Sequence, residues 1–351
     1  MAVKKEESKK ETLSDIMSRL EKTYGKGAVL TLESKPDSDL EVTSSGSLGM
    51  DYIVFGIGGF ARGKLYELMG WEGSGKSTIC GHAVAECQKK GGLAAYIDSE
   101  HAVDKDYFKS LGVDTNAMLF SQPSNGEEGF NIALELINSG LVQMIIIDSD
   151  SALLPKKQVD GDIGDSAMGN KAKLNSSAYP KLKMALSKHK VCMIVISQYR
   201  EKIGVMFGDP RTTQGGHALK FYADVRIEIS RTLAKDGDLI FGNLTKIRTI
   251  KNKMWPPFKK VEFNIIYGKG IDKVGEILDL LKQYGLGKRY KGTYTFDGQK
   301  YLEEEFKEKI LTDPLLYGQL VAKILEKVDG PDDIEVDSVE EIEDIGDEEV
   351  Q

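Results

Sequence analysis

The residues best suited to chemistry are Gly70 to Ser77, with the sequence GWEGSGKS. This is the spacing of a P-loop, in which glycines let the main chain turn so tightly that several backbone N–H groups point at one anion. The run after Ser77 has helical composition, so the anion would lie at a helix N-terminus. The pattern predicts a triphosphate site, in which Lys76 reaches the β- and γ-phosphates and the Ser77 hydroxyl ligates Mg²⁺. The predicted cradle consists of Gly70, Trp71, Glu72, Gly73, Ser74, Gly75, Lys76, Ser77 and Thr78.

Three polar residues follow apolar runs further along the chain. Glu100 comes just after residues 93–98, where a carboxylate can deprotonate a water that attacks the γ-phosphate; a helix N-cap or first-turn acid is the competing interpretation. Asp148 ends the run 144–148 in the Walker B manner, where a carboxylate holds Mg²⁺ or its water; a polar residue that only ends the strand is the competing interpretation. Gln198 follows residues 192–197, and its amide could hydrogen-bond a γ-phosphate and signal its presence to the next segment.

Apolar strands alternate with helical patterns from about residue 40 to 270. This alternation is typical of a doubly wound α/β domain, and near-continuous apolar strands imply a sheet covered on both faces. Ligands of such sheets bind at the carboxyl ends of the strands, which is where the polar residues above lie. The predicted strands cover residues 64–69, 93–98, 144–148, 192–197, 225–229, 245–250 and 261–267.

Two long glycine-rich segments, residues 155–173 and 199–220, follow two of these strands. Long loops are uncommon inside a compact domain and argue for function. Each segment combines apolar side chains with cations, which is what a protein needs to grip a phosphate backbone and to separate stacked bases. Mobile lids over the nucleotide are the alternative. The predicted nucleic-acid contacts are Met168, Gly169, Lys173, Arg200, Lys202, Ile203, Gly204, Val205, Met206, Phe207, Arg211, Thr213, Gly215 and Gly216.

Smaller segments flank the α/β region. A capping-box pattern from Thr12 and apolar residues at helical spacing predict an amphipathic helix that ends near Tyr24. The run 28–32 is a strand candidate that could dock on its own domain or on a neighbouring subunit. Residues 271–330 form a small α+β unit, with helices over 274–285 and 314–328 and a hairpin that turns at Asp297-Gly298. The predicted division is therefore 1–39, 40–270, 271–330 and a tail, 331–351.

The charge of the chain is unevenly distributed. The formal net charge is -8, but residues 331–351 carry eleven carboxylates and neither Lys nor Arg, so the rest of the chain is mildly basic at +3. Such a tail is disordered, and it could compete with an anionic ligand or only solubilise the protein. The three cysteines lie apart in apolar surroundings, which favours a reducing compartment. We see neither a signal peptide nor a membrane span, and expect a cytoplasmic protein.

Together these motifs resemble the RecA-type DNA strand-exchange recombinases of bacteria and phages. The most specific stretches, within residues 12–330, are EKTYGKGAV, GWEGSGKST, YIDSEHAVD, IGDSAMG, KIGVMFGDPRTTQGGHALKFYADVR and IKNKMWPPF. The resemblance implies a RecA-like P-loop ATPase core, a short N-terminal helix-strand arm for polymerisation and a small α+β C-terminal domain. It also implies a DNA-dependent ATPase that forms a filament on single-stranded DNA and catalyses homologous pairing and strand exchange in recombination, DNA repair and the SOS response to DNA damage.

The resemblance also implies roles for single residues. Glu100 is similar to the family's general base, and Asp104 and Tyr107 to its adenine contacts. Gln198 resembles the γ-phosphate sensor that couples ATP to two DNA loops, here Asp160 to Gly169 and Arg200 to Gly216. The phosphate and magnesium ligands would be Lys76, Ser77 and Asp148.

Two lysines extend this implied site across a subunit boundary. Lys251 and Lys253 match residues that the family inserts into the ATP site of the next protomer, so the active site would be complete only in a filament. The implied catalytic set is Glu100, Lys76, Gln198, Lys251 and Lys253. The implied partners are single- and double-stranded DNA and further copies of the chain, with a LexA-like repressor and single-strand-binding or mediator proteins as candidates. No membrane partner is expected.

Several residues depart from the family's pattern. Trp71 stands in place of the usual proline of the P-loop and Gly73 in place of a serine. Glu201 replaces an apolar residue, Pro180 an often basic one and Lys173 an often present arginine. These changes bear on nucleotide and DNA affinity. The rival functions are a RecA-core ring ATPase or motor without strand exchange, and a soluble P-loop kinase.

Overall fold

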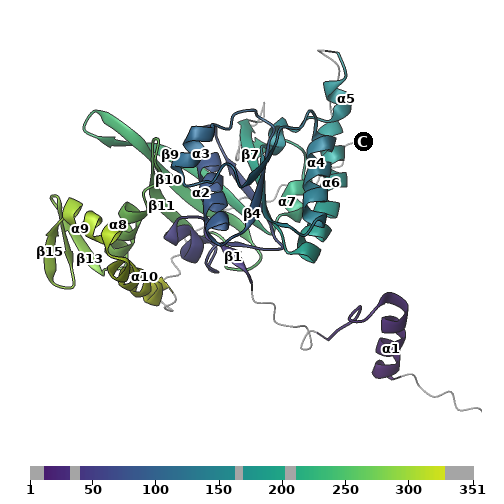
Figure 1. Ribbon diagram of the computed structural model, residues 1–351, viewed down its shortest axis with the longest axis horizontal. Helices are drawn as coiled ribbons and strands as arrows, with labels where there is room; N and C mark the ends of the chain where they lie inside the picture. Colours follow the sequence, from purple (N-terminus) through teal and green to yellow (C-terminus); the bar gives the residue numbers. More distant parts are fainter. Residues whose placement is uncertain (1–11, 32–39, 163–168, 202–210, 329–351) are drawn as a thin grey trace, which may run out of the picture. The chain divides into compact units, whose positions relative to one another are not determined.

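A large β-sheet organises the main part of the chain (Figure 1). The computed structural model describes residues 12–31, 40–162, 169–201 and 211–328. By their internal contacts, residues 1–40 and 41–351 form two units.

The first unit contains helix α1 (Leu13–Tyr24). Thr12 and Asp15 form the predicted capping box, and Gly25, at φ +98°, follows the last turn. The strand candidate at 28–32 forms no strand over residues 28–31 of the single chain: 28 and 29 lie in a bend, and 30 and 31 have no regular secondary structure. A short strand is stable only when a neighbouring strand supplies hydrogen bonds. Residue 32 lies outside the described part.

In the second unit, ten strands form one sheet in the order β12-β11-β10-β9-β3-β7-β6-β4-β5, with β8 paired to β7. The strands β9, β3, β7, β6, β4 and β5 run parallel to their neighbours in this order, whereas β10, β11, β12 and β8 are joined by antiparallel pairing. This confirms the mostly parallel α/β fold. The bounds are β3 (Leu65–Gly70), β4 (Leu93–Asp98), β5 (Met118–Ser121), β6 (Val142–Asp148), β7 (Cys192–Glu201), β8 (Arg211–Thr213), β9 (Val225–Asp236), β10 (Leu239–Asn252), β11 (Lys260–Ile266) and β12 (Gly270–Ile271).

All seven predicted strands are present, and β5, β8 and β12 are additional. Strands β9 and β10 form a long hairpin that extends beyond the end of β11, since β11 pairs with β10 only from Gly242 onward (Figure 1). A separate two-stranded sheet joins β1 (Val42–Thr43) to β2 (Phe60–Ala61), with a π-helical turn, Met50–Val54, between them.

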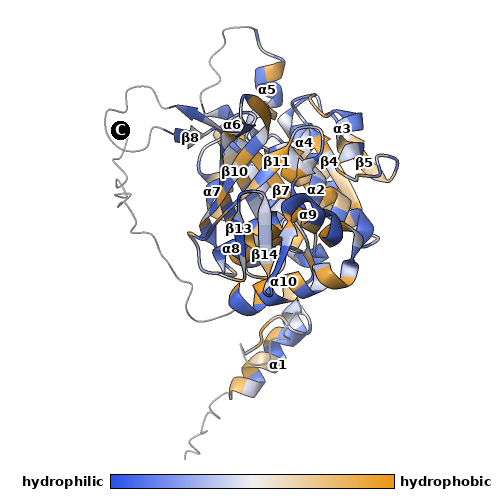
Figure 2. Ribbon diagram, turned by 90° about the vertical axis from the view of Figure 1, so that its left-hand side faces the viewer, coloured by the Kyte–Doolittle hydropathy of each residue, from blue (hydrophilic) through white to orange (hydrophobic). Residues whose placement is uncertain are grey.

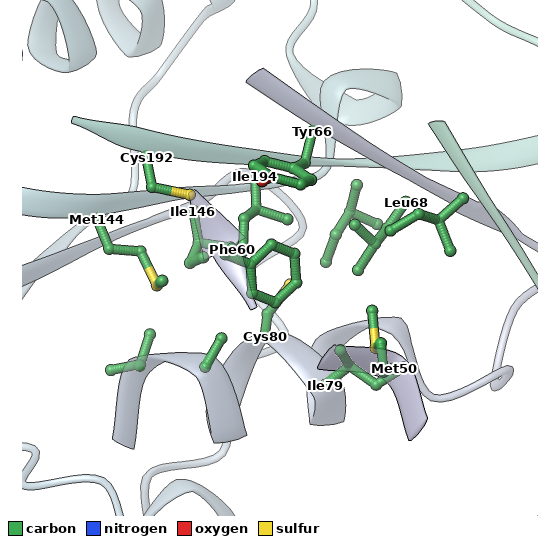
Figure 3. Close-up of a cluster of buried hydrophobic side chains, with 14 of the residues drawn as sticks. Met50, Phe60, Tyr66, Leu68, Ile79, Cys80, Met144, Ile146, Cys192 and Ile194 are labelled. Carbon is green, nitrogen blue, oxygen red and sulfur yellow. The ribbon is translucent and has the colours of Figure 1, made fainter. Parts of the chain in front are cut away.

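Helices cover both faces of the sheet. Helix α2 (Lys76–Lys89) packs Ile79 and Cys80 beneath strand residues such as Tyr66 and Ile146 (Figure 3). On the opposite face, α4 (Gly126–Asn138) and α6 (Asn170–His189) bury their apolar sides in a second cluster. Figure 2 shows hydrophobic residues gathered on the interior strands. The remaining helices here are α3 (Lys105–Ser110), the 3-10 turn Asp150–Ala152, α5 (Lys156–Val159) and α7 (Ala218–Tyr222).

A third hydrophobic cluster holds the C-terminal elements together. Strands β14 and β15 form the predicted hairpin, whose turn residues Asp297 and Gly298 both have positive φ, and β13 adds a third strand. Helix α9 was not predicted. The elements are α8 (Lys273–Gln283), β13 (Gly287–Tyr290), β14 (Thr293–Phe296), β15 (Gln299–Leu302), α9 (Glu303–Thr312) and α10 (Pro314–Val328). Among the described helices, none is both long and apolar enough to cross a membrane.

Candidate active site

The loop between β3 and α2 depends on its glycines. Gly73 and Gly75 have φ values of +69° and +96°, a region that glycine adopts without steric cost. A Cβ on Gly70 would lie 2.4 Å from the carbonyl oxygen of Ile229, so this glycine allows β3 and β9 to approach. Among the described residues, no side chain caps the N-terminus of α2. The loop therefore directs main-chain N–H groups and the positive end of the helix toward one point, as an anion site requires.

Lys76 is bound within this loop. Its Nζ donates hydrogen bonds to the carbonyl oxygens of Gly70 (3.0 Å) and Trp71 (2.8 Å), and the residue is only 6% exposed. Burial lowers the pKa of the ammonium group, and the negative charges of Asp148 and Glu100 oppose that shift. A cation is thus held at the point toward which the loop amides turn.

The carboxyl group of Asp148 lies beside this lysine. Its Oδ2 accepts hydrogen bonds from Ser77 Oγ and from Tyr96 OH, both 2.7 Å away. Burial raises the pKa of Asp148, whereas these two hydrogen bonds favour its ionised form. A hydroxyl and a carboxylate oxygen are hard donors of the kind that Mg²⁺ takes when substrate phosphates and waters complete its shell. Ser77 and Asp148 therefore fit that ion. The described residues contain no cluster of three or more His, Cys, Asp or Glu that could hold a metal by themselves.

Glu100 and Gln198 lie together, although 98 positions separate them in the sequence. Gln198 Nε2 donates to Glu100 Oε1 at 2.6 Å, and Ser149 Oγ donates to the same oxygen. Glu100 is exposed, so it can reach a solvent molecule. The competing N-cap interpretation belongs to another residue, because Asp104 caps α3 by accepting from the main-chain N–H groups of Asp106 and Tyr107.

The two predicted adenine contacts lie beside the P-loop helix. Tyr107 OH is 2.8 Å from Oγ1 of Thr78, the last residue of the predicted cradle. Asp104 already uses Oδ1 in the helix cap. The structure thus connects the start of α3 to the start of α2.

Lys251 and Lys253 are not brought to this group within the chain. Lys251 of β10 lies opposite Arg226, the second residue of β9. Gly70, where the P-loop begins, lies opposite Ile229, which is further along β9. Lys251 Nζ donates to the main-chain oxygens of residues 220 and 221, at 2.9 and 3.0 Å. Lys253 Nζ lies 3.7 Å from a carboxylate oxygen, that of Asp224.

The two glycine-rich segments leave the same edge of the sheet as the site. The second begins and ends in a hairpin, because β7 pairs with β8 from Tyr199–Thr213 to Glu201–Arg211. Gly169, at φ +78°, precedes α6. The predicted contacts that are exposed are Lys173, Arg200, Arg211 and Gly216, and those that are half-buried are Thr213 and Gly215. The predicted contacts Met168, Lys202, Ile203, Gly204, Val205, Met206 and Phe207 lie outside the described residues.

A buried polar cluster that we did not predict joins the bases of these segments. Asp150, two residues after Asp148, is 1% exposed and accepts hydrogen bonds from Tyr179 OH (2.6 Å) and Asn175 Nδ2 (3.2 Å). Asn175 Nδ2 also donates to the carbonyl oxygen of Gly215 at 3.2 Å. Lys171 Nζ lies 3.7 Å from Asp150 Oδ2. The signal in the sequence was a polar residue at every fourth position of α6, which is one face of a helix.

Comparison with known proteins gives one consistent result. The sequence model of the RecA N-terminal domain matches residues 11–272. Protein RecA of Cytophaga hutchinsonii is 48% identical over 316 residues, which cover 89% of each chain. Protein RecA of Nocardioides sp. is 45% identical over 323 residues, 91% of this chain and 92% of that protein. Protein RecA of Chloroherpeton thalassium is 42% identical over 330 residues, 93% of this chain and 92% of that protein.

Proposed function

This chain belongs to the RecA family of recombination and DNA-repair proteins, and we propose that it hydrolyses ATP at the protomer interfaces of a filament on single-stranded DNA. The filament pairs with homologous double-stranded DNA and exchanges strands. One observation carries the proposal: Gln198, at the start of the second glycine-rich segment, donates to Glu100 Oε1. This contact links a base positioned for hydrolysis to a segment suited to DNA.

The phosphates would bind in the cradle of loop amides and the α2 N-terminus. Lys76 Nζ already lies there, and a γ-phosphate would compete with the carbonyl oxygens of Gly70 and Trp71 for its protons. Mg²⁺ bound with the nucleotide would neutralise phosphate charge, and Ser77 and Asp148 are the residues that would hold it.

Glu100 is the proposed general base. Its exposed carboxylate takes a proton from the attacking water, whose oxygen bonds to the γ-phosphorus while the bond to the bridging oxygen breaks and releases ADP. Gln198 and Ser149 both donate to Oε1, which leaves Oε2 for the water. When the γ-phosphate is present, Gln198 has a second acceptor for its amide, so its position reports the nucleotide state.

Lys251 and Lys253 are proposed to act on the neighbouring protomer's nucleotide, as an arginine finger does. Their place at the far end of β9 and β10 supports this, since a single chain does not bring them to its own P-loop. Residues 12–31 and the following run would form the polymerisation arm. The strand absent from 28–31 would then form on a neighbouring subunit, which can supply the missing hydrogen bonds.

The proposal extends to the cellular compartment and the further partners of the protein. All three cysteines are free and buried, which is compatible with the reducing cytoplasm that we propose for it. A LexA-like repressor and single-strand-binding or mediator proteins are the further partners that we propose. A closed-ring motor is not favoured, because the match to the RecA N-terminal domain covers the whole core and the similar relatives are RecA proteins.

The test is ATP hydrolysis by the full chain, measured with and without single-stranded DNA over a range of protein concentrations. We expect DNA to raise turnover by orders of magnitude, because it aligns protomers and completes the sites. The same filaments should exchange a strand with a homologous duplex and not with a heterologous one. Equal turnover by a dilute monomer with and without DNA, or the absence of exchange, would contradict the proposal.

A further inference from the structure

The P-loop carries an aromatic side chain that the mechanism above does not use. Trp71 is 42% exposed, and its ring lies 6.0 Å from the ring of Tyr199, edge to face at 64°. Tyr199 directly follows Gln198 on β7. One end of this aromatic pair therefore lies in the nucleotide cradle, and the other lies where the second glycine-rich segment begins.

The pair continues to a residue further along the same segment. The guanidinium carbon of Arg211, on β8, lies 5.3 Å from the centre of the Tyr199 ring. Arg211 is also ion-paired with Glu228 of β9, and Tyr199 OH donates to the same carboxylate at 3.2 Å. Glu228 in turn pairs with Met69 of β3, the strand that leads into the P-loop. The contacts thus form a closed path from the P-loop through Tyr199 and Arg211 of the segment and back through β9 and β3.

We propose that Trp71, Tyr199 and Arg211 form an aromatic-cation bridge that couples occupancy of the nucleotide cradle to the arrangement of the second DNA loop. Trp71 and Tyr199 act as positioning residues, because neither touches a reacting atom. The inference rests on the proposed function. It adds to the contact between Gln198 and Glu100 a second connection, which runs from Trp71, next to the end of β3, to Tyr199 of β7 and Arg211 of β8.

The physical argument begins at Lys76. Its Nζ holds the Trp71 carbonyl oxygen at 2.8 Å, and phosphate competes for that proton donor. Releasing the carbonyl changes the constraint on the Trp71 backbone and therefore on its ring. An edge-to-face pair is attractive only over a narrow range of geometries, so a displaced Trp71 ring changes the preferred position of Tyr199.

The second half of the argument concerns Arg211. Its charge is shared between Glu228 and the face of Tyr199, so a DNA phosphate must compete with both. A nucleotide that weakens the contact between the Tyr199 ring and the Arg211 guanidinium makes this cation more available to a DNA phosphate. By linkage, DNA that takes Arg211 favours the same nucleotide state in the cradle. The bridge therefore works in both directions.

The experiment compares single-stranded DNA affinity at saturating ATPγS with that at saturating ADP, by anisotropy of a labelled oligonucleotide. The ratio of the two affinities measures coupling and is insensitive to a uniform loss of DNA binding. Trp71→Leu and Tyr199→Leu should each lower the ratio about three- to tenfold, the size expected from one aromatic pair. Trp71→Phe should retain most of it, because a ring remains to face Tyr199.

Arg248 provides a matched control for Arg211. Both arginines pair with Glu228, Arg248 at 3.4 Å, but only Arg211 lies over the Tyr199 ring. Arg211→Gln should lower the ratio, and adding Trp71→Leu should lower it no further, since both changes break one path. Arg248→Gln should leave the ratio at the wild-type value.

A fluorescence measurement provides a second test. The chain has two tryptophans, so Trp255→Phe leaves Trp71 as the only indole. Single-stranded DNA added to the ATPγS complex should change Trp71 emission, and Tyr199→Leu should abolish the change. If the wild type couples nucleotide to DNA but the ratio and the emission change survive Tyr199→Leu, the bridge is wrong. If the wild type binds DNA equally with both nucleotides, the proposed function itself fails.

Discussion

Lys76, at the start of α2, and Lys251, near the end of β10, make similar hydrogen bonds. Each donates from Nζ to two main-chain carbonyl oxygens at 2.8 to 3.0 Å, in the P-loop for the first lysine and in α7 for the second. Burial lowers the pKa of both ammonium groups. Their direct bonding therefore does not distinguish the two sites.

The surrounding charges do distinguish them. At Lys76, the carboxylates of Asp148 and Glu100 oppose the effect of burial on the pKa. At Lys251, the cations Lys253 and Arg226 add to that effect, and the carboxylates of Asp224 and Glu67 oppose it. The first lysine lies beside carboxylates, whereas the second lies beside cations as well as carboxylates. An anion that reached Lys251 would relieve the repulsion between these cations. The comparison supports a division in which Lys76 binds this protomer's phosphates and Lys251 its neighbour's.

The largest expected effect is that of Lys76→Ala. Turnover should fall below detection with and without DNA, because Lys76 is the cation that is hydrogen-bonded inside the loop, to Gly70 and Trp71. ATP hydrolysis measures this, and thermal unfolding checks that the fold persists. Lys89→Ala is the matched control, since this exposed lysine lies at the other end of the same helix. Near-normal turnover of the Lys76 variant would remove the P-loop lysine from the site.

Lys251→Ala should differ from Lys76→Ala in its effect on nucleotide affinity. We expect it to remove most of the DNA-stimulated turnover, by about 10³-fold if the lysine acts as an arginine finger does. Nucleotide affinity of the dilute protein should stay near the wild-type value, unlike that of Lys76→Ala. Lys246→Ala, an exposed lysine on the same strand, is the control. An equal loss of monomer nucleotide affinity in both variants would erase the distinction between the regions.

Glu100→Gln should lower turnover by about 10²-fold or more and leave binding intact. The amide keeps an oxygen to accept from Gln198 and Ser149 but cannot take a proton from water. ATP binding and DNA binding are measured beside hydrolysis. Loss of ATP binding in a folded variant would assign Glu100 another role.

Mixing these two variants tests whether the regions meet across an interface. Some interfaces in a mixed filament pair an intact Glu100 with an intact Lys251, so a mixture of Lys251→Ala and Glu100→Gln subunits should recover part of the turnover. A mixture as inactive as either parent, although both assemble on DNA, would contradict a shared site.

The smallest effect concerns Tyr96, which donates to Asp148 inside the cradle. The ionised form of Asp148 accepts the hydrogen bond from Tyr96 and fits Mg²⁺. Burial raises the pKa of Asp148. Mg²⁺-dependent nucleotide affinity should therefore fall as the pH drops through that pKa. Tyr96→Phe removes a hydrogen bond to ionised Asp148 and so raises the pKa of that carboxyl further. The acidic limb of the pH profile, where affinity falls, should therefore move to higher pH by about one unit. Tyr179→Phe, which loses the equivalent bond to Asp150, should leave the limb in place. An unchanged limb in Tyr96→Phe would mean that Asp148 does not control it.

Much of the fold was predictable because each central strand is a run of apolar residues covered on both faces. The elements that were missed lack this signal. Strand β5 is an edge strand whose residues are half-buried or exposed, and β8 exists because β7 continues past the sheet and offers it a partner. The candidate at 28–32 shows the opposite case, since its composition suits a strand but no strand of the described chain pairs with residues 28–31.

The sequence by itself determined the P-loop, because Gly73, Gly75, Lys76 and Ser77 are so close along the chain that a local turn, allowed by the positive φ of the two glycines, brings them together. It also determined that Asp148 ends a strand. Only the tertiary structure decided which strand ends are neighbours. The contacts of Glu100 with Gln198, of Trp71 with Tyr199 and of Asp150 with α6 depend on strand order and register. Periodicity along one strand shows which residues face the core, but carries no information about which strand lies beside it.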